Sequence, residues 1–211
     1  MARASTDTDV RPDNRAPDPA TLPAHLRDRR DRIVRAALEL LEDGEYDTVQ
    51  IRDVAERADV ALGTLYRYFT SKEHLYAAAL LEWARGFRVR SQRDAGTDEA
   101  RLRALLHRAI RAFERRPQLL RAEMVLQSSN DPNARVLFQQ FADRHHAVMV
   151  DALPGLSADE AAAVVETTSS VMDARLRSWA IGRCSIRDVL AAVDRSVDLI
   201  FSPPPGGGDV R

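Results

Sequence analysis

The sequence predicts an all-helical protein of about nine helices. Ala, Leu, Arg, Asp and Glu dominate the 211 residues, and only 9 glycines and 6% aromatic residues are present. This balance favours helices over strands. Apolar side chains recur at helical spacing in segments separated by helix-cap residues, without the alternation that marks strands. These observations together come close to excluding an all-β fold.

The composition describes a chain without a strong overall charge. The hydrophobic share is 45% and the charged share 30%, and 31 basic against 32 acidic residues leave a net charge of -1. A polyanionic partner must therefore be held by a local patch. The single cysteine, Cys184, excludes an internal disulfide and fits a reducing compartment. No apolar run approaches the roughly 18 residues of a membrane span, and no signal-peptide pattern opens the chain, so we expect a cytoplasmic protein without a membrane partner.

Composition shifts divide the chain into four parts. Residues 1–23 contain four prolines among polar residues and almost no apolar side chains, which predicts a disordered arm. Residues 24–71 hold three short helices, and residues 72–201 form a larger helical domain. Residues 202–211 combine three prolines with three glycines, which predicts a disordered tail.

Four helices are expected before the first polar break. Gly44 ends the first as a C-cap, a turn at Asp59-Val60 separates the second from the third, and Ser71 caps the fourth. The expected ranges are about 25–43, 49–57, 61–68 and 71–90.

Five further helices follow the break at residues 94–97, each with an apolar face at helical spacing. Pro117 and the pair Asp131-Pro132 mark two helix starts, because proline suits the first helical position. The last two helices begin with capping-box spacing, at Ser157 with Glu160 and at Ser185 with Asp188.

Residues 48–72 form two short helices around a tight turn, which is a helix-turn-helix. At about 100° per residue, the second of these helices is expected to bury Leu62, Leu65 and Phe69. A helix that enters the major groove needs small residues for close approach, with hydroxyls and cations for phosphates and bases. The predicted outward face has such residues: Gly63, Thr64, Arg67 and Tyr68, with Tyr66 on its flank.

Two further groups are expected to contact phosphates. Gln50 and Arg52 lie at the start of a helix, where free backbone N–H groups favour an anion, and Lys72 starts the fourth helix. Ordinary structural roles compete with these assignments. Tyr66 and Tyr68 alternatively pack the motif, and Arg67 alternatively remains solvated.

The segment V-A-x-x-A-x-V-x-x-G-T-L-Y-x-Y-F-x-S-K, residues 54–72, resembles the DNA-binding signature of the TetR family of bacterial repressors. The match covers roughly residues 25–75, and within the family residues 49–52 and 61–69 resemble KstR-type actinobacterial regulators of steroid degradation. The resemblance implies that residues 24–71 bind a double-stranded DNA operator, and that residues 72–201 bind a ligand and dimerise.

The resemblance also assigns roles to residues. Arg52 corresponds to a base-reading residue, and Gln50 lies near a phosphate. Thr64 and Tyr66 correspond to contacts of the recognition helix, and Lys72 to the phosphate anchor. Tyr68 occupies a position that is often histidine. Ala61 departs from the commoner serine, so no contact from that side chain is expected.

A helix-turn-helix reads one half-site, so we expect a homodimer on a palindromic operator. The last two helices are expected to form its interface, because their apolar stripes exceed what one small body covers. They alternatively complete the core of a single chain. The predicted interface residues are Thr168, Val193, Val197 and Ile200.

An apolar effector pocket is expected among the fourth to eighth helices, where large side chains gather; the alternative is a filled core. The resemblance suggests a small hydrophobic effector such as a lipid or steroid-like acyl-CoA. His145, Gln127 and Arg175 are expected to orient it. The expected apolar lining consists of Trp83, Phe87, Phe113, Met124, Phe138, Phe141, Met172 and Trp179.

Two other functions compete with the ligand-responsive repressor. An all-α hydrolase using His145 or His146 lacks a nucleophile motif and a phosphate loop. Adjacent histidines point about 100° apart, so they do not form a metal site, and no cofactor or catalytic residue is expected. A helical adaptor without DNA binding is the second alternative, and a gel-shift experiment separates it from a repressor.

Overall fold

The computed structural model describes residues 16, 17, 19–85 and 96–202, and within these ranges every regular element is a helix. The predicted all-helical class is therefore confirmed. A short 3-10 helix precedes nine α-helices in the described part of the chain. Their bounds are η1 Pro19–Thr21, α1 Ala24–Asp43, α2 Ile51–Arg57, α3 Leu62–Tyr68, α4 Lys72–Arg85, α5 Asp98–Arg115, α6 Pro117–Leu126, α7 Pro132–Val150, α8 Ala158–Ala180 and α9 Ile186–Phe201.

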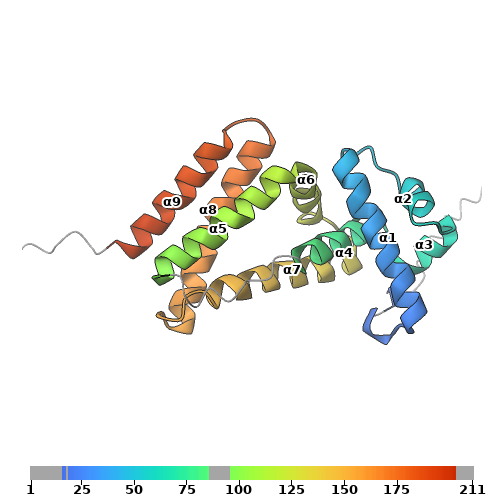
Figure 1. Ribbon diagram of the computed structural model, residues 1–211, viewed down its shortest axis with the longest axis horizontal. Helices are drawn as coiled ribbons and strands as arrows, with labels where there is room; N and C mark the ends of the chain where they lie inside the picture. Colours follow the sequence, from blue (N-terminus) through green and yellow to red (C-terminus); the bar gives the residue numbers. More distant parts are fainter. Residues whose placement is uncertain (1–15, 18, 86–95, 203–211) are drawn as a thin grey trace, which may run out of the picture.

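The helices are arranged along an elongated molecule (Figure 1). Helices α1, α2 and α3 gather at one end, and α5, α8 and α9 lie at the other. Helices α4 and α7 run alongside each other between the two ends. This arrangement separates a small three-helix unit from a larger helical body, with α4 leading directly from one to the other.

The three-helix unit is held together by tertiary packing. Helices α2 and α3 have seven residues each, too short to be stable alone in water. Val54 of α2, Leu65 of α3 and Phe69, which follows α3, join a core with Ile33 and Ala37 of α1. The turn between α2 and α3 places Asp59 at φ 52, a left-handed conformation that Asp tolerates better than most residues.

Side-chain caps begin most helices of the body. Thr97 accepts from Ala100 N at 3.2 Å, and Asp131 accepts from Asn133 N at 2.7 Å. The predicted capping boxes at Ser157 and Ser185 are both present and are confirmed. These bonds satisfy backbone N–H groups that the first turn of a helix leaves without partners.

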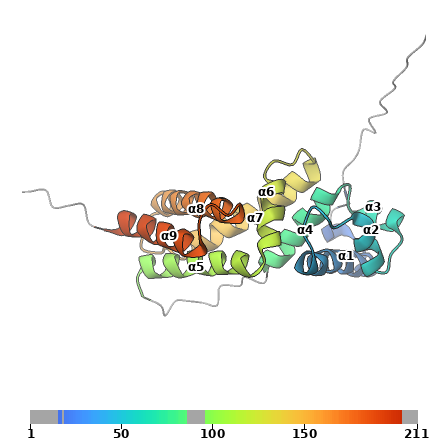
Figure 2. The ribbon, with the colours of Figure 1, turned by 90° about the horizontal axis from the view of Figure 1, so that it is seen from above.

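Helices α8 and α9 form a packed pair, and α5 lies across α9 (Figure 2). Arg103 of α5 joins Asp194 and Asp198 of α9 at 2.8 and 2.6 Å. His107 Nε2 is 2.7 Å from the same Asp194 carboxylate. Burial raises the pKa of Asp194, but the hydrogen bonds from Arg103 and His107 outweigh it and bring the pKa below its usual value. The carboxylate therefore stays ionised and fastens α9 to α5.

The first and last described helices can be compared with the predicted domain boundaries. Residues 19–21 form η1 and Leu22 packs against the core, so ordered structure begins before the boundary predicted at residue 23. Helix α1 ends at Gly44 as expected, where Gly44 N donates to Leu40 O at 3.0 Å. Helix α9 ends at Phe201. Residues 1–15, 18, 86–95 and 203–211 lie outside the described part, and with them most of the predicted arm and tail.

Candidate nucleic-acid interface

Helix α3 presents an exposed face that the protein does not use for packing. Tyr66 is 51% exposed, and Gly63 and Arg67 are also exposed. A Cβ added at Gly63 would meet no atom within 4 Å, so this position is open to a surface that approaches closely. Thr64 is half-buried beside these residues. The face combines a small residue, a hydroxyl, an aromatic ring and a cation on one short helix.

The structure corrects two residues of this helix. Tyr68 is only 7% exposed and lies in the core, whereas it was expected to face outward. Leu62 is 43% exposed, whereas it was expected to be buried. Leu65, Tyr68 and Phe69 are spaced i, i+3, i+4 and form the buried face, because the chain turns into α4 directly after them. Leu62 belongs to the first turn, beyond the edge of that core, and joins the exposed face.

Two polar side chains lie at the start of α2, the helix that packs against α3. Gln50 is exposed, and its backbone N donates to Asp53 Oδ2 at 3.0 Å. The side chain of Arg52 is 72% exposed, and its Nε lies 3.5 Å from Asp53 Oδ1. The Asp53 carboxylate therefore accepts a hydrogen bond at the start of α2 and lies next to the Arg52 guanidinium. An exposed pair of this kind contributes little stability, so the guanidinium is available to an external partner.

Lys72, the expected phosphate anchor, also has a role inside the protein. Its Nζ donates to Tyr46 O at 2.5 Å and lies 4.5 Å from the centre of the Tyr46 ring. Burial lowers the pKa of Lys72, while Asp47 and Glu73 act in the opposite direction. These contacts tie the first residue of α4 to the segment between α1 and α2, and they orient the ammonium group.

The predicted pocket residues are divided between the core and the surface of the body. Phe113, Phe141 and Met172 are buried, and Trp83, Met124, Phe138, His145 and Trp179 are half-buried. Several are in ring contact: Trp83 with Phe113 at 5.2 Å, and Phe141 with Phe138 at 6.0 Å and with His145 at 6.4 Å. Phe87 lies outside the described residues.

Two of the three predicted polar groups are at the surface, which corrects that expectation. Gln127 is exposed and accepts a hydrogen bond from Arg177, and Arg175 is exposed as well. Arg175 lies off the buried face that Met172 and Leu176 define on α8. His145 remains inside: its Nε2 is buried and has no hydrogen-bond partner among the described residues, and burial lowers the pKa of the ring.

The sequence interpretation missed Glu123 of α6, a polar group that is buried. Burial, together with the nearby carboxylate of Asp173, raises the pKa of Glu123 to about 8. The group is therefore protonated at neutral pH. Its position among Leu119, Leu120 and Leu126 on the apolar face of α6 was the available signal.

The predicted interface residues are mostly internal. Thr168, Val193 and Val197 are fully buried within one chain, so the assignment of these side chains to a partner-facing surface is wrong. The apolar stripes of α8 and α9 pack on each other and on α5. Ile200 is half-buried, and its neighbour Leu199 is 81% exposed.

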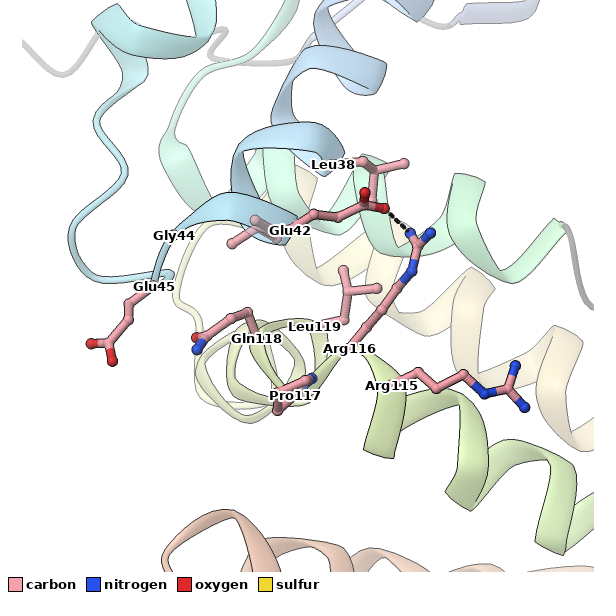
Figure 3. Close-up of a pocket in the computed structure, with 10 residues that line it drawn as sticks. Leu38, Glu42, Gly44, Glu45, Arg115, Arg116, Pro117, Gln118 and Leu119 are labelled. Atoms are coloured by element: carbon pink, nitrogen blue, oxygen red, sulfur yellow. Dashed lines mark ion pairs between the residues drawn. The ribbon is translucent and has the colours of Figure 1, made fainter.

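A crevice of about 430 Å³ lies where the end of α1 meets the start of α6 (Figure 3). Glu42 and Arg116 form an ion pair across it, with Nη1 and Oε1 2.6 Å apart. Its lining mixes leucines with charged side chains, and none of the predicted effector residues belongs to it. The lining consists of Leu38, Leu41, Glu42, Gly44, Glu45, Arg115, Arg116, Pro117, Gln118 and Leu119.

Neither a membrane helix nor a metal site is found in the described part. None of its helices is long and apolar enough to cross a membrane. Across residues 16, 17, 19–85 and 96–202, no three His, Cys, Asp or Glu side chains are grouped to hold a metal ion.

Comparison with known proteins agrees with the fold and with the exposed helix. Residues 33–79 match the model of bacterial regulatory proteins of the tetR family, and residues 96–200 match a tetracyclin repressor-like C-terminal domain. The HTH-type transcriptional repressor KstR of Rhodococcus jostii is 36% identical over 83% of this chain and 84% of its own length. The chain therefore belongs to the TetR family of transcriptional regulators, and it is not an enzyme.

Two solved structures resemble the chain over most of its length. A TetR regulator from Rhodococcus sp. RHA1 has a TM-score of 0.73 and 29% identity, over 84% of this chain and 97% of its own. FadR from Bacillus subtilis, solved with stearoyl-CoA, has a TM-score of 0.60 and 19% identity, over 82% and 97%. At 19% identity, the similarity to FadR shows a shared fold.

Proposed function

We propose that this regulator is a repressor that binds a palindromic operator as a homodimer and leaves it when a small hydrophobic effector binds. The observation that carries the proposal is the exposed face of α3, where Gly63, Tyr66 and Arg67 have no packing role. Arg52 and Gln50 extend this face from α2 and are assigned to a base and a phosphate. Leu62 joins it as an apolar group suited to a thymine methyl.

Selection of duplexes from genomic fragments, followed by footprinting, tests operator binding. An inverted repeat with two equally protected half-sites is expected. Lys72→Ala should weaken all sequences alike and reduce the slope of log affinity against log salt by about one. An unchanged slope would show that the Lys72 ammonium contacts Tyr46 but no phosphate. Absence of any duplex binding by the wild type would favour the helical adaptor.

We assign dimerisation to the exposed faces of α8 and α9 in place of their buried stripes. Leu199 is the most exposed large apolar residue of α9, and the exposed positions of α8 include the small residues Ala163, Thr167 and Ala174, which permit close helix approach. Leu199→Asp should give monomers in sedimentation experiments. Val136→Asp, which also replaces an exposed apolar residue with aspartate but on α7, should leave the dimer intact. Dimers in both variants would refute the assignment.

We place the effector among α4 to α8, beside Phe113, Phe141 and Met172. The unpartnered His145 Nε2 is the polar group best suited to hold it, because a buried polar atom gains from a hydrogen bond. FadR, which has the same fold, binds stearoyl-CoA, and this supports an acyl-CoA with a hydrophobic tail as the effector. Helix α4 begins at Lys72 and runs past Trp83, so a tilt of α4 would change the separation of the two recognition helices.

Titration of stearoyl-CoA and of a steroid-like acyl-CoA against the operator complex tests this part. One of them should release the DNA, and operator DNA should weaken its binding by the same factor. His145→Phe, which keeps the ring and removes its polar atoms, should weaken that ligand. A ligand that binds tightly without changing operator affinity would overturn the regulatory part of the proposal.

A further inference from the structure

The segment between the recognition helix and α4 is joined to the first residue before α7. Thr70 follows α3 by two positions, and its hydroxyl donates to Asp131 Oδ2 at 3.1 Å. Asn133 Nδ2 donates to the same hydroxyl oxygen at 3.1 Å. The Thr70 hydroxyl group is thus bonded to two residues that lie 61 and 63 positions later in the sequence. The bonds connect the segment after α3 to the start of α7 in the larger helical body.

The two oxygens of Asp131 have separate partners. Oδ1 accepts from the backbone N–H groups of Asn133 and Ala134 at 2.7 and 3.0 Å, which is the N-cap of α7. Oδ2 accepts from Thr70. Burial raises the pKa of Asp131, but its hydrogen bonds from Ser71, Ala134, Asn133 and Thr70 bring the pKa below the usual value. An ionised carboxylate makes stronger hydrogen bonds than a neutral acceptor does.

His74, in the first turn of α4, holds the same segment from the other side. Its Nδ1 accepts from the backbone N of Thr70 at 3.2 Å, and its backbone N donates to Ser71 Oγ at 2.9 Å. Burial lowers the pKa of His74 to about 4, so the ring is neutral and Nδ1 is free to accept. The Thr70 hydroxyl oxygen lies 3.2 Å from the same Nδ1 and 3.1 Å from Asp131 Oδ2, and its proton is donated to the ionised carboxylate, which is the stronger acceptor.

The segment is also packed on the apolar side. The His74 ring meets Phe69, the last residue of α3's buried face, at 5.3 Å, and the Arg30 guanidinium of α1 lies 5.2 Å from the Phe69 ring centre. Arg30 is largely buried, which lowers its pKa, and Asp31 partly offsets this effect. Residues 69–71 therefore have contacts to α1, α4 and the start of α7, and none of these contacts reaches the exposed face of α3.

We propose that Thr70 and Asp131 form a tie that positions the recognition helix and transmits changes in α7 to it without passing along α4. The proposal rests on the operator binding proposed above. Helix α7 carries Phe138, Phe141 and His145, which belong to the proposed effector site, so movement of α7 by an effector would act on the end of α3 through this tie. Without the tie, α3 adopts its binding-competent orientation in a smaller fraction of molecules, and the apparent operator affinity falls by that fraction.

Two substitutions separate the tie from the helix cap. Thr70→Val removes the hydroxyl at nearly constant shape. Asp131→Ser keeps a good N-cap with its single oxygen but has no second oxygen for Thr70. Thr97→Val, which removes the N-cap of α5 only, is the matched control for loss of a cap.

Operator affinity is the first measurement. Thr70→Val and Asp131→Ser should each lose about tenfold, and the double variant should lose clearly less than the two losses combined, because both single changes remove the Thr70–Asp131 bond. The salt slope should stay at the wild-type value, since no phosphate contact is lost. Additive losses, no loss, or an equal loss in Thr97→Val would overturn the tie.

Hydrogen exchange is the second measurement. Operator binding should slow exchange of the Asn133 and Ala134 amides in the wild type, although they belong to α7, and Thr70→Val should abolish that slowing. In the free protein, Asp131→Ser should speed exchange at residues 69–71 and Thr97→Val should not. Unchanged exchange at residues 69–71 would overturn the tie. This comparison needs no DNA, so it decides the tie even if the wild type bound no operator, a result that would overturn the proposed function separately.

Discussion

At the DNA-binding end, α2 and α3 have seven residues each, and α3 begins at Ala61 without a side-chain cap. In the body, α5, α7 and α8 have 18, 19 and 23 residues, and side chains of Thr97, Asp131 and Ser157 cap them. Long capped helices contribute to their own stability, whereas a helix of seven residues depends on the core beneath it. The outer face of α3 is therefore not needed for folding, and its residues are available for DNA. In the body, most of the large apolar residues are needed for packing.

Substitution of Val193 should have the largest effect and should show how tightly the body depends on its core. Val193→Asp places a charge at a fully buried site, so we expect a loss of more than about 4 kcal/mol in the free energy of unfolding. Urea denaturation measures it. Val136→Asp on the exposed side of α7 should change stability by less than about 0.5 kcal/mol. Equal, small losses in both variants would show that Val193 is not internal.

The buried carboxyl group of Glu123 should make the stability of the protein depend on pH. Its pKa is about 8 in the folded protein and near 4.5 when exposed, so the folded state holds a proton that the unfolded state releases between these values. Stability should therefore fall as pH rises from about 4.5 to 8, by about 1.4 kcal/mol for each unit of pKa difference that is realised.

Glu123→Gln removes this dependence, because the amide does not ionise. The variant should match the wild type near pH 5 and exceed its stability by a few kcal/mol at pH 8, as measured by urea denaturation at each pH. Glu56→Gln, at an exposed site of α2, serves as the control and should follow the wild-type curve. Parallel curves for Glu123→Gln and the wild type would contradict the buried, protonated carboxyl.

Arg52→Ala should weaken operator binding without changing the stability of the folded protein. We expect a loss of about 1–3 kcal/mol in operator binding and relaxed preference at one base pair, with stability within about 0.5 kcal/mol of the wild type. Competition between operator variants measures the preference. Arg57→Ala on the same helix, whose guanidinium pairs with Glu39 of α1 at 3.4 Å, should keep the base preference. An identical loss in both variants would make Arg52 a general cationic contact.

Gly63→Ala should stabilise the fold slightly and should separate folding from binding most clearly. Alanine favours a helix by up to about 1 kcal/mol over glycine, and the new methyl group meets no atom, so stability should rise. Operator affinity should fall because the methyl occupies space needed by DNA. Gly182→Ala, at φ 73, should instead cost about 1 kcal/mol and leave operator binding unchanged. Unimpaired binding by Gly63→Ala would place DNA farther from α3.

The sequence predicted the recognition helix but not its full exposed surface. The motif over residues 54–72 located both helices within about two residues, because capping and turn signals are local. The 100° rule placed Leu62 inside and Tyr68 outside, and both were reversed. A helical wheel gives the direction of a side chain around the axis but not how far along the axis the neighbouring core extends. Helix α3 is only two turns long, so this end effect decides two of its seven residues.

The apolar stripe of α9 shows the same limit on a larger scale. Val193 and Val197 were correctly identified as residues that need cover, but the sequence did not say whether a second subunit or the same chain covers them. The structure shows α5 and α8 covering them, with Arg103 fastening α5 to Asp194 and Asp198. Burial depends on which elements meet, and that is a property of long-range packing.

The sequence by itself determined the helical class, the helix starts and the family, since periodicity, caps and a local motif depend on residues within a few turns of one another. Only the tertiary structure decided that Glu123 is buried and protonated, that Gln127 and Arg175 lie at the surface, and that Thr70 meets Asp131. Each result depends on tertiary packing. Glu123 of α6 lies near Asp173 of α8, Gln127 and Arg175 are exposed at the surface of the body, and the end of α3 meets the start of α7. Contacts between residues some 60 positions apart leave no periodic signal in a single sequence, because any polar pair at those positions fits the local pattern equally well.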